Sequence, residues 1–219
     1  MKNRKVDIII VALIAITLVW LLAIYQGLPD TIPTHWNISG EADNFGSKNS
    51  LFIMFAVMVG INLLLPLLAK IDPRSDNYKR FSHAYDVFRI AFTLFFMALM
   101  FIAVQEAKGD TSSIFTVENL VPSLIGVLFV VIGNYMPKFK HNYTIGIKTP
   151  WTLANEEVWN KTHRMAGPIW TAGGVIMVFN QFVFTTEISK IVLIAVIVSI
   201  IAIPTLYSYL EYKKVKSKE

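Results

Sequence analysis

The chain has 219 residues, of which 54% are hydrophobic and 16% are charged, with a net charge of +5. Soluble domains carry about 25% charged residues, so this composition argues against a water-soluble globular protein and indicates a lipid bilayer as the solvent. The absence of cysteine excludes disulfides, thiolate metal sites and a cysteine nucleophile.

Six apolar blocks are long enough, or nearly so, to cross a bilayer, which takes about 20 mostly apolar residues. In chain order they are Ile8–Tyr25, Leu51–Ala69, Ile90–Val104, Leu120–Met136, Met165–Phe184 and Ile191–Tyr209. The third block is short, so we expect its helix to begin near His83, with Asp86 and Arg89 facing protein or the interface. A cleaved signal peptide explains the first block less well, because Asp7 interrupts the basic start and no small-residue cleavage site follows. The sequence therefore predicts an all-α integral membrane protein with about six transmembrane helices.

The basic residues predict the orientation, because cytoplasmic loops are enriched in Lys and Arg. With the N-terminus inside, sixteen of the 20 Lys and Arg residues fall in inner segments, three fall in outer segments, and Arg89 lies within the third span. Six spans then place both termini in the cytoplasm. We divide the chain into residues 1–69 with an external loop 26–50, residues 70–119 with the third span, and residues 120–219 with a cytoplasmic loop 137–164.

The external loop is the first candidate for function. Pro29 and Pro33 favour an extended entry, and Gly40 and Gly46 favour turns. The residues that we select as ligand-binding candidates are His35, Trp36, Glu41 and Asp43. The alternatives are a small ordered cap that contacts an extracellular ligand, and a plain connector whose aromatic side chains anchor it at the headgroups. A metal site at His35 with Glu41 or Asp43 is weakly supported, because a single histidine with scattered carboxylates matches no ligand pattern.

The cytoplasmic loop is the second candidate. Its middle piece is β-branched and predicts a short extended segment, Thr152 is a fair N-cap for the helix that follows, and Glu156 lies near the positive end of that helix. Helical spacing places Glu156, Trp159, Asn160 and His163 on one face. We select Asn134, Asn142, Trp151, Glu156, Trp159, His163 and Arg164 as functional candidates. The competing interpretation is an interfacial helix with aromatic residues at the headgroups and basic residues toward anionic lipid.

The same two loops carry a resemblance to a known family. The runs Gly133–Pro137, Asn142–Leu153 and Trp159–Gly167 resemble the signature of the SdpI family, and Leu28–Lys48 resembles an uncharacterised domain that precedes this signature in many members. The resemblance implies a multispan membrane protein that protects the cell from a secreted SDP-like peptide toxin. It further implies a toxin receptor that holds a transcriptional repressor at the membrane. It implies no catalytic residue.

Two other functions stay open from the residues alone. A membrane hydrolase or transferase would use Glu156, Glu157 and His163 for general acid–base chemistry, but no hydrolase, metal or phosphate-binding motif accompanies them. His141 and His163 with Glu156 match no known metal-ligand spacing. A small exporter is disfavoured because the spans contain few ionisable residues. The resemblance implies a non-enzymatic immunity protein whose partners are membrane lipid, a peptide toxin and a cytoplasmic repressor. From the residues we expect no metal or cofactor and no direct nucleic-acid contact.

Overall fold

The computed structural model describes residues 3–37, 42–109 and 117–218. The helices are α1 (Arg4–Tyr25), α2 (Ser50–Ile71), α3 (Asn77–Arg80), α4 (Ser82–Ala107), α5 (Val117–Tyr135), α6 (Pro150–Ala154), α7 (Glu156–Val183) and α8 (Thr186–Lys216). A 3-10 turn, η1 (Met136–Lys138), follows α5, and two strands, β1 (Thr31–Trp36) and β2 (Ala42–Ser47), separate α1 from α2. As predicted, α4 begins close to His83.

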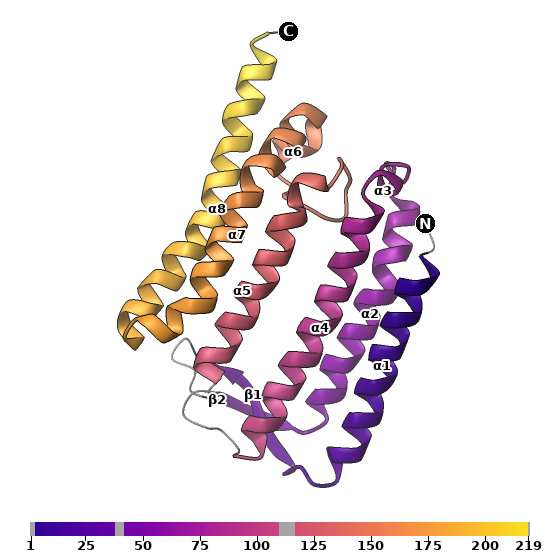
Figure 1. The fold of residues 1–219 in the computed structure, drawn as a ribbon, viewed down its shortest axis with the longest axis vertical. Helices are drawn as coiled ribbons and strands as arrows, with labels where there is room; N and C mark the ends of the chain where they lie inside the picture. Colours follow the sequence, from indigo (N-terminus) through magenta and orange to yellow (C-terminus); the bar gives the residue numbers. More distant parts are fainter. Residues whose placement is uncertain (1–2, 38–41, 110–116, 219) are drawn as a thin grey trace.

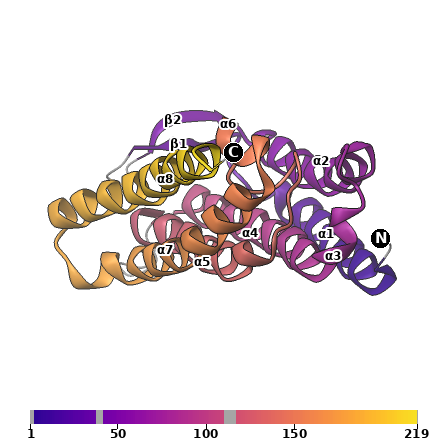
Figure 2. The ribbon, with the colours of Figure 1, turned by 90° about the horizontal axis from the view of Figure 1, so that it is seen from above.

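The long helices run alternately up and down, so both chain ends lie at the same end of the bundle (Figure 1). We call this the loop end, because it also holds α3, α6 and residues 139–149. The two strands lie at the opposite end, which we call the hairpin end. Viewed from above, α1, α2 and α4 form one group and α5, α7 and α8 form the other (Figure 2). The two predicted functional loops therefore lie at opposite ends of the molecule.

Among the described residues, five helices are long and apolar enough to cross a membrane, namely α1, α2, α4, the helix from Val117 to Lys138 and α8. In a bilayer an α-helix satisfies its own backbone hydrogen bonds, which explains why these apolar blocks form uninterrupted helices. The predicted fifth span lies in α7, which runs beside α5 and α8 (Figure 1). Its composition is less apolar, because it begins with the polar segment 156–164 and carries small and polar residues where it packs. The protein is thus an α-helical membrane protein, and a sixth span in α7 stays a prediction.

Glycines bring α5 and α7 unusually close together. A Cβ atom on Gly126 would lie 2.6 Å from the carbonyl oxygen of Gly174, and one on Gly133 would lie 2.8 Å from that of Gly167. Such distances are shorter than any real Cβ contact, so the backbones touch where these glycines meet. Small residues at helix interfaces allow this approach in membranes, where van der Waals contact replaces the hydrophobic effect as the main driving force.

Polar side chains join α1 to α4 near the loop end. Arg89 donates to the Asp7 carboxylate at 2.9 Å, and Asn3 donates to the Asp86 carboxylate at 2.9 Å. Asp86 and Arg89 are both buried. Of the two predicted placements for them, the structure has the one that faces protein.

Candidate functional sites at the two ends of the bundle

The irregular segment after η1 folds around the amide of Asn142. The Asn142 side chain donates to the carbonyls of Lys140 and Ile145 at 2.7 and 2.9 Å, and its oxygen accepts from the amides of Thr144 and Ile145 at 2.8 and 2.7 Å. It is fully buried. The Asn142 side chain thus makes hydrogen bonds to backbone groups that would otherwise pair in a strand. The segment predicted to be extended therefore forms a series of bends.

Asp72 ties this segment to the first half of the chain. Its carboxylate accepts from the Tyr78 hydroxyl at 2.7 Å and from the amide of Tyr143 at 2.8 Å. Burial alone would raise the pKa of the Asp72 carboxyl, but hydrogen bonds from Tyr78, Arg74, Tyr143 and Thr144 outweigh it and lower that pKa. Asp72 therefore stays ionised and anchors the segment through charge-assisted hydrogen bonds.

Trp159, at the start of α7, forms the centre of the packing. Its indole nitrogen donates to the carbonyl of Phe139 at 2.8 Å, and its ring stacks on His141 and on His163 with centroid distances of 5.0 and 4.0 Å. All three rings are buried. We call residues 139–149 together with Trp159 and His163 the loop core.

The two ring nitrogens of His163 have fixed roles. Nε2 accepts from the amide of Ile147 at 2.9 Å, which leaves Nδ1 to donate to the carbonyl of Trp159 at 2.9 Å. The ring is therefore neutral, since a protonated Nε2 cannot accept. Burial lowers the pKa of His163 to about 4, and burial likewise lowers the pKa of His141.

Gly146 is required beside these rings. Its φ of +128° is a conformation that side chains rarely adopt, and a Cβ atom there would clash with Nε2 of His163 and the Trp159 ring. The glycine therefore lets the segment close over the imidazole.

The end of the loop is held to α7 and α8 by capping interactions. Thr149 and Thr152 form a reciprocal capping box on α6, and the Thr149 hydroxyl lies 3.0 Å from that of Ser208 on α8. Asn155 caps α7 by accepting from the amide of Val158 at 3.0 Å. The expectation that Thr152 caps the long helix is thus wrong, because Asn155 is the residue that precedes its first turn.

The His163 pKa predicts that acid loosens the loop core. Unfolded histidine has a pKa near 6.5, so between that value and about 4 the unfolded segment binds more protons, and stability falls as the pH drops through this window. We expect a loss of about 3 kcal/mol between pH 7 and pH 4. Trypsin cleavage at Lys140 and Lys148 in detergent should become faster at pH 5 than expected from the pH dependence of trypsin itself. The exposed His83 provides a control, since His83→Asn should leave the effect unchanged. Equal protection at pH 7 and 5 would contradict the assignment.

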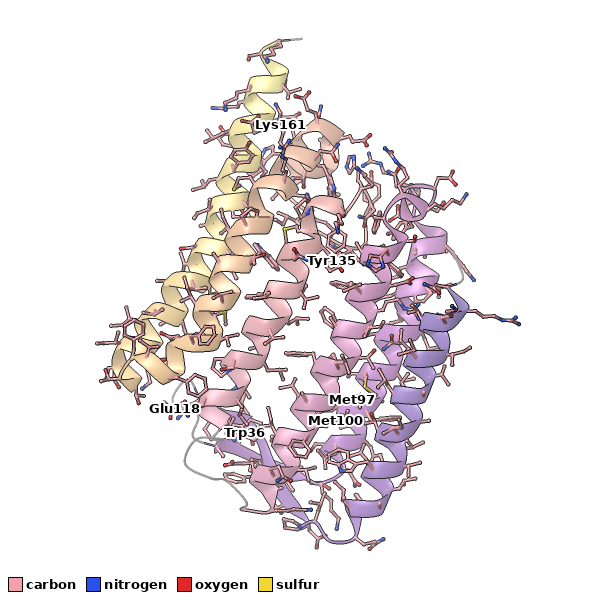
Figure 3. The ribbon with its side chains drawn as sticks, in the orientation of Figure 1. Trp36, Met97, Met100, Glu118, Tyr135 and Lys161 are labelled. Carbon is pink, nitrogen blue, oxygen red and sulfur yellow. The ribbon has the colours of Figure 1, made fainter. Side chains whose placement is uncertain are left out.

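At the hairpin end, β1 and β2 form a two-stranded antiparallel sheet with an irregular register near His35. The His35 imidazole contacts the Asp43 carboxylate across the strands, and both side chains are exposed, by 66% and 43%. Trp36, labelled in Figure 3, lines a cavity of about 310 Å³ together with residues of α2 and α4. Lys48 pairs with Asp30 at 3.0 Å and closes the base of the hairpin. Glu41 lies outside the described residues.

The structure separates the loop candidates into two groups. Asn142, Trp159 and His163 are buried in the loop core, whereas Asn134, Glu156 and Arg164 are exposed, and Trp151 packs on Tyr209 at 5.0 Å. The shared face predicted for Glu156, Trp159, Asn160 and His163 is therefore wrong in part, because only the two aromatic residues turn inward. The predicted interfacial helix consists of the first turns of α7, which continue without a break. Asp72, Tyr78 and Gly146, which also hold the loop core in place, were not among the candidate residues selected from the sequence.

This arrangement brings together few groups suited to catalysis. Both ring nitrogens of His163 are engaged, and Glu157 forms an ion pair with Lys161 at 2.8 Å on the outer side of α7. Over residues 3–37, 42–109 and 117–218, no three His, Asp or Glu side chains are grouped as a metal site would require. The loop core is thus a packed structural unit that positions the exposed side chains around it.

Comparison with known proteins agrees with the motifs in both loops. Residues 138–208, which include the loop core, match the SdpI/YfhL protein family, and residues 12–59 match a domain of unknown function, DUF1648. The chain is 28% identical to the immunity protein SdpI of Bacillus subtilis over 98% of both chains. It is also 43% identical over 61 residues to an uncharacterised protein of Archaeoglobus fulgidus, covering 27% of this chain and 33% of that protein. No solved structure matches the chain.

The two matches cover different parts of the chain, 12–59 and 138–208. The DUF1648 match begins in α1, contains the hairpin and ends in α2. The family match begins at η1 and ends in α8. The similarity to the Bacillus protein spans both matched ranges.

Proposed function

We propose that this protein is a membrane immunity protein that protects its cell against a secreted SDP-like peptide toxin. The observation that carries the proposal is the similarity to an immunity protein over 98% of both chains, in a protein with several apolar helices. The same family relationship favours a binding function over an enzymatic one. A hydrolase at the inner interface remains the alternative.

In this proposal the hairpin end faces the outside and meets the toxin. The sixteen basic residues that the sequence assigns to inner segments support this orientation, which reagent labelling of Ser47→Cys from outside intact cells would check. The exposed His35 and Asp43 offer polar contacts, and Trp36 offers an amphipathic ring of the kind enriched in binding hot spots.

The loop end would carry any response inside the cell. Glu156, Asn160 and Arg164 are exposed around the buried loop core and offer contacts for a cytoplasmic repressor. About 30 Å of hydrocarbon separates the two ends, so toxin binding would reach the loop end only through a shift between two arrangements of the helices.

The test of immunity is whether cells survive while the peptide stays chemically intact. Sensitive cells that express the protein should survive a dose of SDP-like peptide that kills cells with an empty vector, and mass spectrometry should find the peptide intact in the medium. Protection accompanied by protein-dependent cleavage or modification of the peptide would favour the enzyme instead. Unchanged killing at normal protein abundance would reject immunity to that peptide.

The test of the hairpin is binding from outside. His35→Ala and Trp36→Ala should each weaken peptide binding to membranes by about fivefold or more, since a hot-spot residue contributes more than about 1 kcal/mol. Thr31→Ala, at an exposed position of the same hairpin, is the control and should bind normally. If the lost protection follows membrane abundance in every variant, the hairpin only anchors helices.

A further inference from the structure

The loop core presents one aromatic side chain to the outside. Tyr143 is 46% exposed, whereas Phe139, Trp159 and His163 are buried. A single exposed aromatic residue needs no explanation by itself. Tyr143 differs from such a residue because its backbone and its ring are both fixed by neighbouring charged groups.

Three side chains hold Tyr143 in place. Its amide donates to the Asp72 carboxylate at 2.8 Å, and the Arg74 guanidinium lies over its ring at 5.1 Å from the ring centroid. The Lys148 ammonium donates to the carbonyls of Tyr143 and Thr144 at 3.4 and 3.0 Å. The ring is thus preorganised although it is largely uncovered, and a partner that binds a preorganised side chain loses less conformational entropy.

The surface around the Tyr143 ring carries a positive charge. Arg74 and Lys148 form no ion pair with a carboxylate among the described residues. The Asp72 carboxylate is buried and already accepts from the Tyr78 hydroxyl and the amide of Tyr143. Two cations therefore outnumber one carboxylate. Tyrosine and arginine are both enriched in binding hot spots, and complementary charge selects an acidic partner.

The position of the segment favours a protein partner over lipid. Asp72, which binds the amide of Tyr143, is the C-cap of α2, and the Thr149 hydroxyl lies 3.0 Å from that of Ser208 on α8. Residues 139–149 therefore cross the loop end from one helix group to the other, over the end of the bundle rather than along its lipid-facing sides (Figure 1). A side chain exposed there is accessible to a protein in the adjacent water.

We propose that Tyr143, Arg74 and Lys148 form a docking surface for an acidic segment of a protein partner. A Glu or Asp carboxylate of the partner pairs with Arg74 or Lys148, and an apolar side chain beside it packs on the exposed part of the Tyr143 ring. This inference rests on the proposed response at the loop end and adds the surface and the charge of the partner. With the orientation proposed above, the partner is cytoplasmic.

Fluorescence anisotropy of labelled peptides with the full chain in an uncharged detergent tests this surface. The probe is a peptide of about ten residues, rich in Glu and Asp with a central Leu pair, and a second peptide has Lys in place of every acidic residue. We expect the acidic peptide to bind at least about tenfold more tightly than the basic one. Its binding should weaken at high salt, because salt screens exposed charges.

Variants of the surface separate docking from general attraction to a basic end. Tyr143→Ala and Arg74→Gln should each weaken binding of the acidic peptide by about fivefold or more, whereas Tyr143→Phe keeps the ring and should bind nearly normally. Lys213→Gln is the matched control. Lys213 also lies over a tyrosine ring, that of Tyr209, at 4.8 Å, so this variant removes the same charge at the same end and should bind normally.

The unfolding temperature separates binding from folding. In Tyr143→Ala the amide that Asp72 holds is still present, so the unfolding temperature should change little. Should this variant unfold earlier, Arg74→Gln decides, because it leaves the contact between Asp72 and the amide of Tyr143 in place.

Three results would overturn the proposal. They are equal binding of both peptides, an equal loss in Arg74→Gln and Lys213→Gln, and retention of phosphatidylglycerol that disappears in Tyr143→Ala while the acidic peptide does not bind. The last result would identify a lipid contact instead. Because the assay contains no toxin, its failure leaves the survival test of immunity unaffected.

Discussion

Trp159→Ala is expected to dismantle the loop core. The indole is fully buried, stacks on two imidazoles and donates to the carbonyl of Phe139 at 2.8 Å. Its loss leaves a large cavity together with an unpaired carbonyl, and replacement of a buried tryptophan by alanine costs about 3–5 kcal/mol. We expect hydrogen exchange throughout residues 139–149 to become much faster, while exchange in α1 and α2 stays close to that of the unmodified chain.

Trp151→Ala is the matched control. This second tryptophan of the same loop is only partly buried and packs on Tyr209 of α8, so its loss should cost much less and leave exchange at residues 139–149 nearly unchanged. Trp159→Phe keeps part of the stacking and should fall between the two. If both alanine variants behaved alike, Trp159 would not be the centre of the loop core.

The Trp159→Ala variant also tests the proposed role of the loop end inside the cell. A loop core that positions exposed residues predicts that Trp159→Ala cells lose protection or partner docking while peptide binding at the hairpin is retained. Arg164→Ala, at an exposed position on α7, should affect docking without affecting hydrogen exchange. Loss of peptide binding in Trp159→Ala membranes with normal protein abundance would instead mean that the two ends are not separable.

The long helices were predictable from the sequence because a bilayer requires long apolar segments, and this requirement is local. The early start of α4 followed from the length that a span requires, because the third apolar block alone is too short. The added residues include Asp86 and Arg89, which face protein near the start of α1. The sequence predicted an extended entry and turns in the external loop and left open whether it is an ordered cap or a plain connector, because the pairing of β1 with β2 depends on packing against distant helices.

The loop core was predictable only in part, because much of it depends on residues distant in sequence. Trp159 and His163 stood out by type and helical spacing, and Asn142 stood out only as part of the motif that resembles the SdpI family. Asp72 did not, because nothing near it in the sequence indicates that its carboxylate binds the amide of Tyr143, 71 residues away. Helical spacing grouped Glu156 with Trp159, but spacing does not say which side of a helix is covered, and here the carboxylate faces outward.

Gly174→Val is expected to separate α7 from α5. A Cβ atom at Gly174 would lie 2.5 Å from the carbonyl oxygen of Gly126 and 2.7 Å from the amide nitrogen of Val130, both backbone atoms that cannot rotate away. The helices must move apart, with the loss of contacts along their interface, and overpacking of this kind costs about 1–3 kcal/mol or more. The purified variant should unfold at a lower temperature in detergent and accumulate less in membranes.

The matched control for this variant is Gly60→Val on α2. A Cβ atom at Gly60 would meet nothing within 4 Å, so the same substitution adds the same volume at a position with open space around it, and stability should change little. Gly126→Val, on the opposite side of the contact, should reproduce the defect, because its Cβ atom would meet the carbonyl of Gly174. The family match begins only after α5, so this contact joins α7 to a helix outside the matched region. If Gly174→Val and Gly60→Val were equally stable, α5 and α7 would not be in backbone contact, and the loop core that closes over their ends would need another support.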